Sequence, residues 1–167
     1  MTPAPSAAFD LARYQDPLTI QRVIHHAKTI AIVGLSPNEL RASHFVGFYL
    51  LRHGYTVIPV NPRETEVLGQ RSYASLLDVP VHVDIVDVFR TPDAVPAIAR
   101  EAATIQAGAL WCQFGVISEE GARIAEAGNV PVVIDRCLKV EHARYVGRMH
   151  WLGFNTRRIT SVRGGLQ

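Results

Sequence analysis

The feature that most constrains the fold is the stretch from Thr29 to Asn38, which reads TIAIVGLSPN. Apolar and β-branched residues run without interruption up to Gly34, a pattern typical of a parallel strand buried on both faces. A short polar turn follows, and the next helical pattern begins only near Ser43. Glycine permits close backbone approach to a ligand, and a helix N-terminus favours an anion. The stretch therefore predicts a strand, a ligand-binding loop and a helix.

The same alternation of strand and helix continues along the chain. Further strands are expected over residues 55–60, 83–88, 108–112 and 130–134, and helices over 17–27, 43–53, 73–77, 91–105 and 118–127. Strands alternating with helices are typical of parallel sheets with right-handed crossovers. The sequence therefore predicts an α/β fold, a Rossmann-like doubly wound parallel sheet of about five strands in a three-layer αβα sandwich.

One domain is expected for residues 1–167, because this length with 48% hydrophobic residues can bury one substantial core. Within it, residues 1–16 are expected to be a loosely held tail, 17–146 the core and 147–167 a C-terminal extension.

Residues 67–69 predict a short turn or edge piece. Asp84 and Asp87 alternate with apolar residues, which favours an exposed or edge-capping role for both carboxylates.

The composition excludes several classes of protein. The formal net charge of +2 is too balanced to indicate a nucleic-acid partner. No apolar run approaches the roughly 20 residues of a membrane span, and the first residues lack the pattern of a signal peptide, so a cytoplasmic location is expected. The two cysteines form no disulfide framework, and the seven histidines lack ligand spacing, so no metal site is expected.

Basic residues gather in the loops that follow the predicted strands. Ligands of such sheets bind at the carboxyl ends of the strands. These loops and their flanks contain Arg41, Arg63, Arg90, Arg136 and Lys139. A polyanionic ligand is therefore expected, although for any one arginine it is equally open that the side chain is solvated or paired with Glu39, Glu64, Asp93 or Asp135.

The loops also discriminate among nucleotides. Ser36 and Glu39 stand where a dinucleotide fingerprint places its second and third glycines. After the second strand, the acid that holds a ribose in NAD sites is replaced by Asn61, Pro62 and Arg63. A phosphorylated ribose fits better, which leaves NADP and coenzyme A (CoA), and the missing second glycine disfavours the NADP pose.

Several ordered blocks carry a resemblance to a known family. They are VGLSPNELRASHFVGFYLLRHGYTVIPVNPRETEVLG, VDIVDVFRTPDAVP, ALWCQFGVISEEGARIAEAG and VIDRCLKVEH. Together they resemble the small stand-alone CoA-binding proteins, which are similar to the CoA-binding N-terminal domain of the succinyl-CoA synthetase α subunit. The resemblance implies that CoA is contacted at Gly34, Leu35, Ser36, Arg41, Asn61, Pro62, Arg63, Val88, Phe89, Arg90, Gln113, Phe114, Gly115, Arg136, Cys137 and Lys139.

The expected function is therefore non-catalytic binding of CoA or acyl-CoA. The resemblance implies that a ligase would also need a phosphohistidine domain, which 167 residues cannot hold beside this sheet. Cys137 near His142 and Asp135 suggests a nucleophile, but no base is evidently within reach, so a packing or thiol-pairing role is favoured. A mixed disulfide between Cys137 and the thiol of CoA is a further hypothesis. The alternatives are an NADP-linked oxidoreductase and a regulatory subunit of an acyl-CoA ligase, and the expected partner proteins are a second copy or such a ligase.

Overall fold

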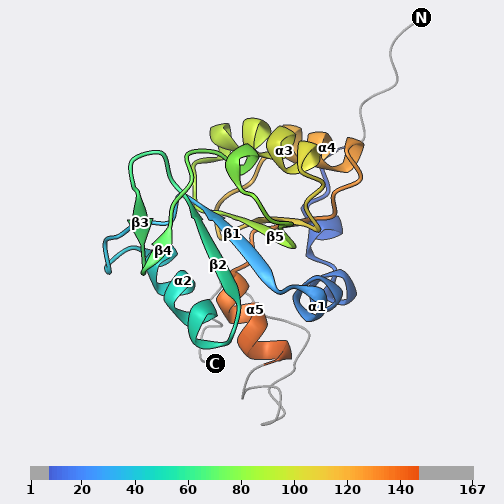
Figure 1. Ribbon diagram of the computed structural model, residues 1–167. Helices are drawn as coiled ribbons and strands as arrows, with labels where there is room; N and C mark the ends of the chain where they lie inside the picture. The colour runs from blue at the N-terminus through green and yellow to red at the C-terminus, as the bar shows by residue number, and fades with distance from the viewer. Residues whose placement is uncertain (1–7, 147–167) are drawn as a thin grey trace, which may run out of the picture.

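Five parallel strands form the centre of the molecule, in the order β2-β1-β5-β6-β7 (Figure 1). The computed structural model describes residues 8–146. The strands are β1 (Thr29–Val33), β2 (Thr56–Val60), β5 (Ile85–Val88), β6 (Leu110–Cys112) and β7 (Val132–Ile134). The chain moves from β1 to β2 on one side and then returns to place β5 on the other side of β1. Strand order therefore reverses between β1 and β5, where ligands of such sheets bind.

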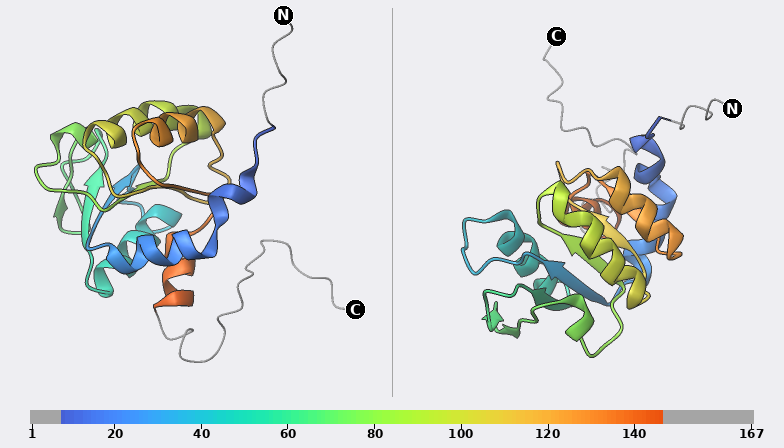
Figure 2. Two further views of the ribbon diagram at one scale, coloured as in Figure 1. Left: turned by 90° about the vertical axis from the view of Figure 1, so that its right-hand side faces the viewer. Right: turned by 90° about the horizontal axis from the view of Figure 1, so that it is seen from above.

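Helices cover both faces of this sheet (Figures 1 and 2). On one face lie α3 (Val95–Thr104) and α4 (Glu119–Ala127). On the other lie α1 (Pro17–His26), α2 (Ala42–Arg52) and α5 (Leu138–Tyr145). The three-layer Rossmann-like fold is thus confirmed, while α5 was not predicted because its sequence is polar and lacks a clear apolar stripe.

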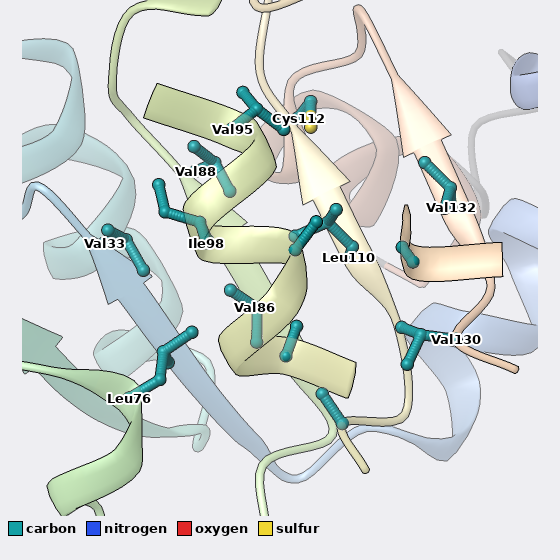
Figure 3. Close-up of a cluster of buried hydrophobic side chains, with 14 of the residues drawn as sticks. Val33, Leu76, Val86, Val88, Val95, Ile98, Leu110, Cys112, Val130 and Val132 are labelled. Atoms are coloured by element: carbon teal, nitrogen blue, oxygen red, sulfur yellow. The ribbon is translucent and has the colours of Figure 1, made fainter. Parts of the chain in front are cut away.

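Each face of the sheet has its own apolar core. Figure 3 shows the first, in which Val86, Leu110 and Ile98 pack between the sheet and α3. The second holds Ile32 and Trp111 against the opposite helices. Successive strand residues point to opposite faces, so a strand covered on both sides must be apolar at nearly every position. This explains the continuous apolar runs of the sequence.

Short elements fill the connection from β2 to β5. A hairpin is formed by β3 (Glu66–Val67) and β4 (Gln70–Arg71), which confirms the edge piece. The helix expected over 73–77 is wrong: Tyr73 pairs with Val60, and only a 3₁₀ turn, η2 (Leu76–Asp78), follows. A second such turn, η3 (Pro92–Ala94), precedes α3.

The N-terminal segment packs against the domain from Phe9 onward, so the prediction of a loose tail does not hold for residues 9–16. A 3₁₀ turn, η1 (Leu11–Gln15), buries Tyr14, whose hydroxyl donates to Glu126 Oε2 at 3.1 Å. Arg13 pairs with the other oxygen of Glu126 at 2.8 Å. The expected C-terminal extension over 147–167 lies outside the described residues. Between residues 8 and 146, none of the helices combines the length and apolar character needed to cross a bilayer.

Candidate functional site

A basic hollow of about 850 Å³ opens at the carboxyl ends of β1, β2 and β5. Its charged lining residues are all arginines, namely Arg41, Arg63 and Arg90. No salt bridge among residues 8–146 involves any of the three, although the pKa of Asp93 is lowered, first by a hydrogen bond from the Thr91 side chain and in smaller part by the charge of Arg90. The complete lining is Gly34, Ser36, Arg41, Ala42, Ser43, Asn61, Pro62, Arg63, Phe89, Arg90 and Thr91. Three arginines that lack salt bridges in the described part of the chain surround one hollow, which favours a multiply charged anion.

An apolar hollow of about 510 Å³ adjoins the basic one, and Arg90 is its single charged lining residue. The two share Ala42, Phe89, Arg90 and Thr91. The rest of its lining is Val46, Pro92, Gln113, Phe114, Gly115, Val116 and Cys137. A ligand that spans both hollows must combine a charged part with a largely apolar part.

A third, side hollow of about 350 Å³ lies between the first turns of α2 and α5. Arg41, Cys137 and Lys139 line it, and Lys139 Nζ lies 4.5 Å from the centre of the Phe45 ring. Ala42 borders all three hollows. The structure thus brings together predicted site residues from all five strand ends.

Gly34 sets the distance between two walls of the basic hollow. Its φ is +89°, and a Cβ there would lie 2.5 Å from the carbonyl oxygen of Phe89. Its own N–H donates to Val60 O at 2.9 Å. The glycine is therefore required by the close packing of the loops after β1 and β5, and its N–H is not free for a phosphate.

The loop after Gly34 satisfies most of its own donors. Ser36 N–H donates to Ser43 Oγ at 3.0 Å, and Asn38 N–H donates to Ser36 Oγ at 3.1 Å. The helix expected from Ser43 begins one residue earlier, and its N-cap is Arg41, which makes no side-chain capping bond. The N–H groups of the first turn of α2 lack intrahelical acceptors and border the basic hollow. They, rather than the glycine loop, are the main-chain donors best placed for an anion.

The side chain of Asn61 connects two loops of the site by hydrogen bonds. Its Nδ2 donates to Leu35 O at 3.1 Å, and its Oδ1 accepts from Arg63 N–H at 3.0 Å. Both ends of its amide are therefore engaged by the protein. Asn61 ties the loops after β1 and β2 together and orients the backbone that carries Arg63.

Three expected contact residues do not line any of these hollows. The side chains of Leu35 and Val88 are fully buried in the two apolar cores. Arg136 points toward the N-terminal segment, where its Nη2 donates to Gln15 Oε1 at 3.2 Å. Conversely, Ala42, Ser43 and Thr91 line the basic hollow without having been predicted as contacts, although Ser43 and Thr91 stood out as helix starts.

A buried carboxyl lies beside the apolar hollow. Asp87 is fully buried, which contradicts its expected exposure, and Gln113 Nε2 donates to its Oδ1 at 2.6 Å. Burial raises the pKa of Asp87 to about 8, opposed by the hydrogen bond from Gln113. Asp84 does cap an edge, as expected, because its Oδ2 accepts from the N–H groups of Lys28 and Thr29.

Cys137 lacks the surroundings of an activated nucleophile. Burial raises the pKa of its thiol, so the thiolate is disfavoured. His142 hydrogen-bonds to Tyr49 Oη at 2.9 Å, and burial lowers the pKa of His142 to about 4. The imidazole is thus neutral at pH 7, and its hydrogen bond with Tyr49 joins α5 to α2.

The residues between β1 and α5 define the class of protein. The family model of the CoA-binding domain matches residues 28–143, so the chain belongs to the CoA-binding domain family. It is 37% identical over 124 residues to the uncharacterized protein YneT of Bacillus subtilis, covering 74% of this chain and 92% of that protein.

Other similar proteins include stand-alone structures and parts of ligases. A hypothetical protein from Pyrococcus horikoshii has a TM-score of 0.79 at 33% identity, covering 85% of this chain and all of that one. A Thermus thermophilus structure has a TM-score of 0.74 at 39% identity, covering 78% and 98%. An ADP-forming acetate–CoA ligase of Archaeoglobus fulgidus is 28% identical over 69% of this chain, but the match covers only 18% of the ligase.

Proposed function

We propose that this protein binds CoA or an acyl-CoA thioester without catalysing a reaction on it. The observation that carries the proposal is the junction of two unlike hollows, one lined by three arginines and one largely apolar. CoA has the same division, because a triply phosphorylated adenosine part continues into an uncharged pantetheine arm. Membership of the CoA-binding domain family supports this ligand.

In this proposal the phosphates lie against the first turn of α2 and the side chains of Arg41 and Arg90. Arg63, which follows β2, is the partner of the 3′-phosphate. The arm runs past Phe89 into the apolar hollow. The weak acidity of Cys137 and the engaged ring of His142 support binding without catalysis.

Calorimetry with CoA and 3′-dephospho-CoA tests the proposal. CoA should bind at least tenfold more tightly, because a charge-assisted contact to phosphate contributes about 1.5–3 kcal/mol. Arg63→Met should remove this difference, whereas Arg100→Met, an exposed arginine of α3, should keep it. Affinity should also fall as salt rises. Equal affinities for both ligands in the unmodified protein would refute the role of Arg63, and tighter binding of NADPH than of CoA would refute the ligand.

Ser43→Ala should show whether the Ser43 hydroxyl shapes the binding site in addition to stabilising the fold. Its hydroxyl is buried and accepts from Ser36 N–H, so its removal should lower the free energy of unfolding by about 1–2 kcal/mol. Ser118→Ala is the matched control, because Ser118 Oγ accepts from Gly121 N–H at the same distance of 3.0 Å and Ser118 lines none of the three hollows. Denaturant unfolding should show similar losses, and calorimetry should show weaker CoA binding for Ser43→Ala alone. Unchanged binding in both variants would exclude a role of Ser43 in shaping the site.

A further inference from the structure

The pair of Asp87 and Gln113 places one oriented amide on the wall of the apolar hollow. Gln113 directly follows β6 and is 5% exposed, and Asp87 is fully buried near the end of β5. The hydrogen bond from Gln113 Nε2 to Asp87 Oδ1 is short, at 2.6 Å. It turns the nitrogen end of the amide toward the protein interior.

The oxygen end of the same amide is left for another partner. Gln113 Oε1 accepts no hydrogen bond from residues 8–146. In that region, the side-chain nitrogen and oxygen atoms that are both inaccessible to solvent and without a hydrogen-bond partner belong to Asp87, Glu141 and Arg144. Gln113 Oε1 is not among them, so it is accessible to solvent. The oxygen therefore reaches the hollow that Gln113 lines. Most of its neighbours there, such as Phe89, Val46 and Val116, offer only carbon.

Asp87 has the features of a residue that positions this amide. Burying a carboxyl group without a cation costs free energy. Among the described residues its hydrogen bond is to Gln113, and its second oxygen, Oδ2, has no partner. Holding Gln113 in one orientation gives a physical reason for this cost, because an amide free to rotate would present either end to the hollow.

We infer that the apolar hollow is a subsite for a linear arm containing secondary amides, with Gln113 Oε1 accepting a hydrogen bond from one amide N–H and Asp87 as its positioning residue. This inference rests on the proposed function and extends it to the recognition of the pantetheine arm. Methylene groups of such an arm would contact Phe89 and Val46, and its N–H would satisfy the single oriented acceptor. An arm of plain hydrocarbon would leave that acceptor unpaired.

The test compares CoA with 3′,5′-ADP, which has the adenosine and two of the phosphates but no arm. Gln113→Met keeps the length of the side chain and removes its acceptor, so CoA should bind about five- to tenfold more weakly while 3′,5′-ADP is unaffected. Asp87→Ala leaves Gln113 in place but frees its amide, so it should cause a smaller loss, again for CoA alone. A residue with a merely structural role would weaken both ligands together.

A second arm of the experiment needs no folded variant. Two CoA analogues, each with one amide N–H of the arm replaced by an ester oxygen, are titrated into the unmodified protein. One of them should bind about five- to tenfold more weakly than CoA, and Gln113→Met should not distinguish that analogue from CoA. Equal binding of CoA and both analogues to the unmodified protein overturns the inference, as does an equal loss of CoA and 3′,5′-ADP in Gln113→Met. If the unmodified protein binds neither CoA nor 3′,5′-ADP, the proposed function itself fails, whereas failure of the inference alone leaves both ligands bound.

Discussion

Gly34→Ala is expected to lower the free energy of unfolding by about 2–5 kcal/mol and to weaken CoA binding strongly. An alanine at a φ of +89° is strained by about 1–2 kcal/mol. Its Cβ would also meet the carbonyl oxygen of Phe89 at 2.5 Å, and forcing such a contact apart costs about 1–3 kcal/mol more. Relief requires the loops after β1 and β5 to separate, which moves Phe89 and Arg90 in the wall of the basic hollow.

Gly69→Ala is the matched control for this prediction. Gly69 has a φ of +71°, but no heavy atom lies within 4 Å of the position that its Cβ would take. It should therefore show the backbone strain alone, about 1–2 kcal/mol, and leave CoA affinity unchanged. Thermal or denaturant unfolding combined with calorimetry measures both quantities. Equal stability losses in the two variants would mean that the contact with Phe89 relaxes without cost.

Asp87 should make the free energy of unfolding fall as pH rises, which is opposite to the usual effect of a carboxylate that is paired in the folded state. Burial raises its pKa in the folded state to about 8, from an ordinary value of 3.8. Between these values the unfolded chain has released the proton and the folded chain has not, so stability falls as pH rises. The free energy of unfolding then falls by up to about 1.4 kcal/mol for each pH unit. The stabilisation of the folded state by the bound proton of Asp87 is complete below pH 4 and is lost once the pH passes about 8.

Asp87→Asn removes this titration while keeping an oxygen that can accept from Gln113. The variant should become progressively more stable than the unmodified protein from pH 5 to 8, by several kcal/mol at pH 8. His142, whose pKa is lowered to about 4, destabilises the protein as pH falls below 6.5, but it does so in both proteins. Urea unfolding at several pH values measures the difference. A difference that does not vary with pH would show that Asp87 is ionised in the folded state.

The sequence predicts the sheet well because burial on both faces leaves a strong local signal. The apolar runs around Ile32, Val86 and Val133 locate three strands, and the helix expected over 118–127 agrees with α4 to within one residue. The loops that gather at the carboxyl edge follow from parallel strand topology alone. Most of the predicted contact residues therefore lie in the hollows.

The failures arise where tertiary packing overrides local pattern. Asp87 alternates with apolar residues as an exposed strand residue would, but helices cover both sides of β5 and Gln113 pairs with it. In α5, Glu141 and Arg144 are buried, so the helix has no apolar stripe to reveal it. Arg136 shares a strand end with Cys137 but turns to Gln15, a contact between distant parts of the chain.

Ala42 has a consequence that reaches beyond its small size. A single methyl group stands where the basic, apolar and side hollows meet. A bulkier uncharged side chain at this position would take up space on the shared border of the three hollows without altering any charge. The volume of one residue in the first turn of α2 is therefore expected to affect how much space a ligand finds in all three hollows at once.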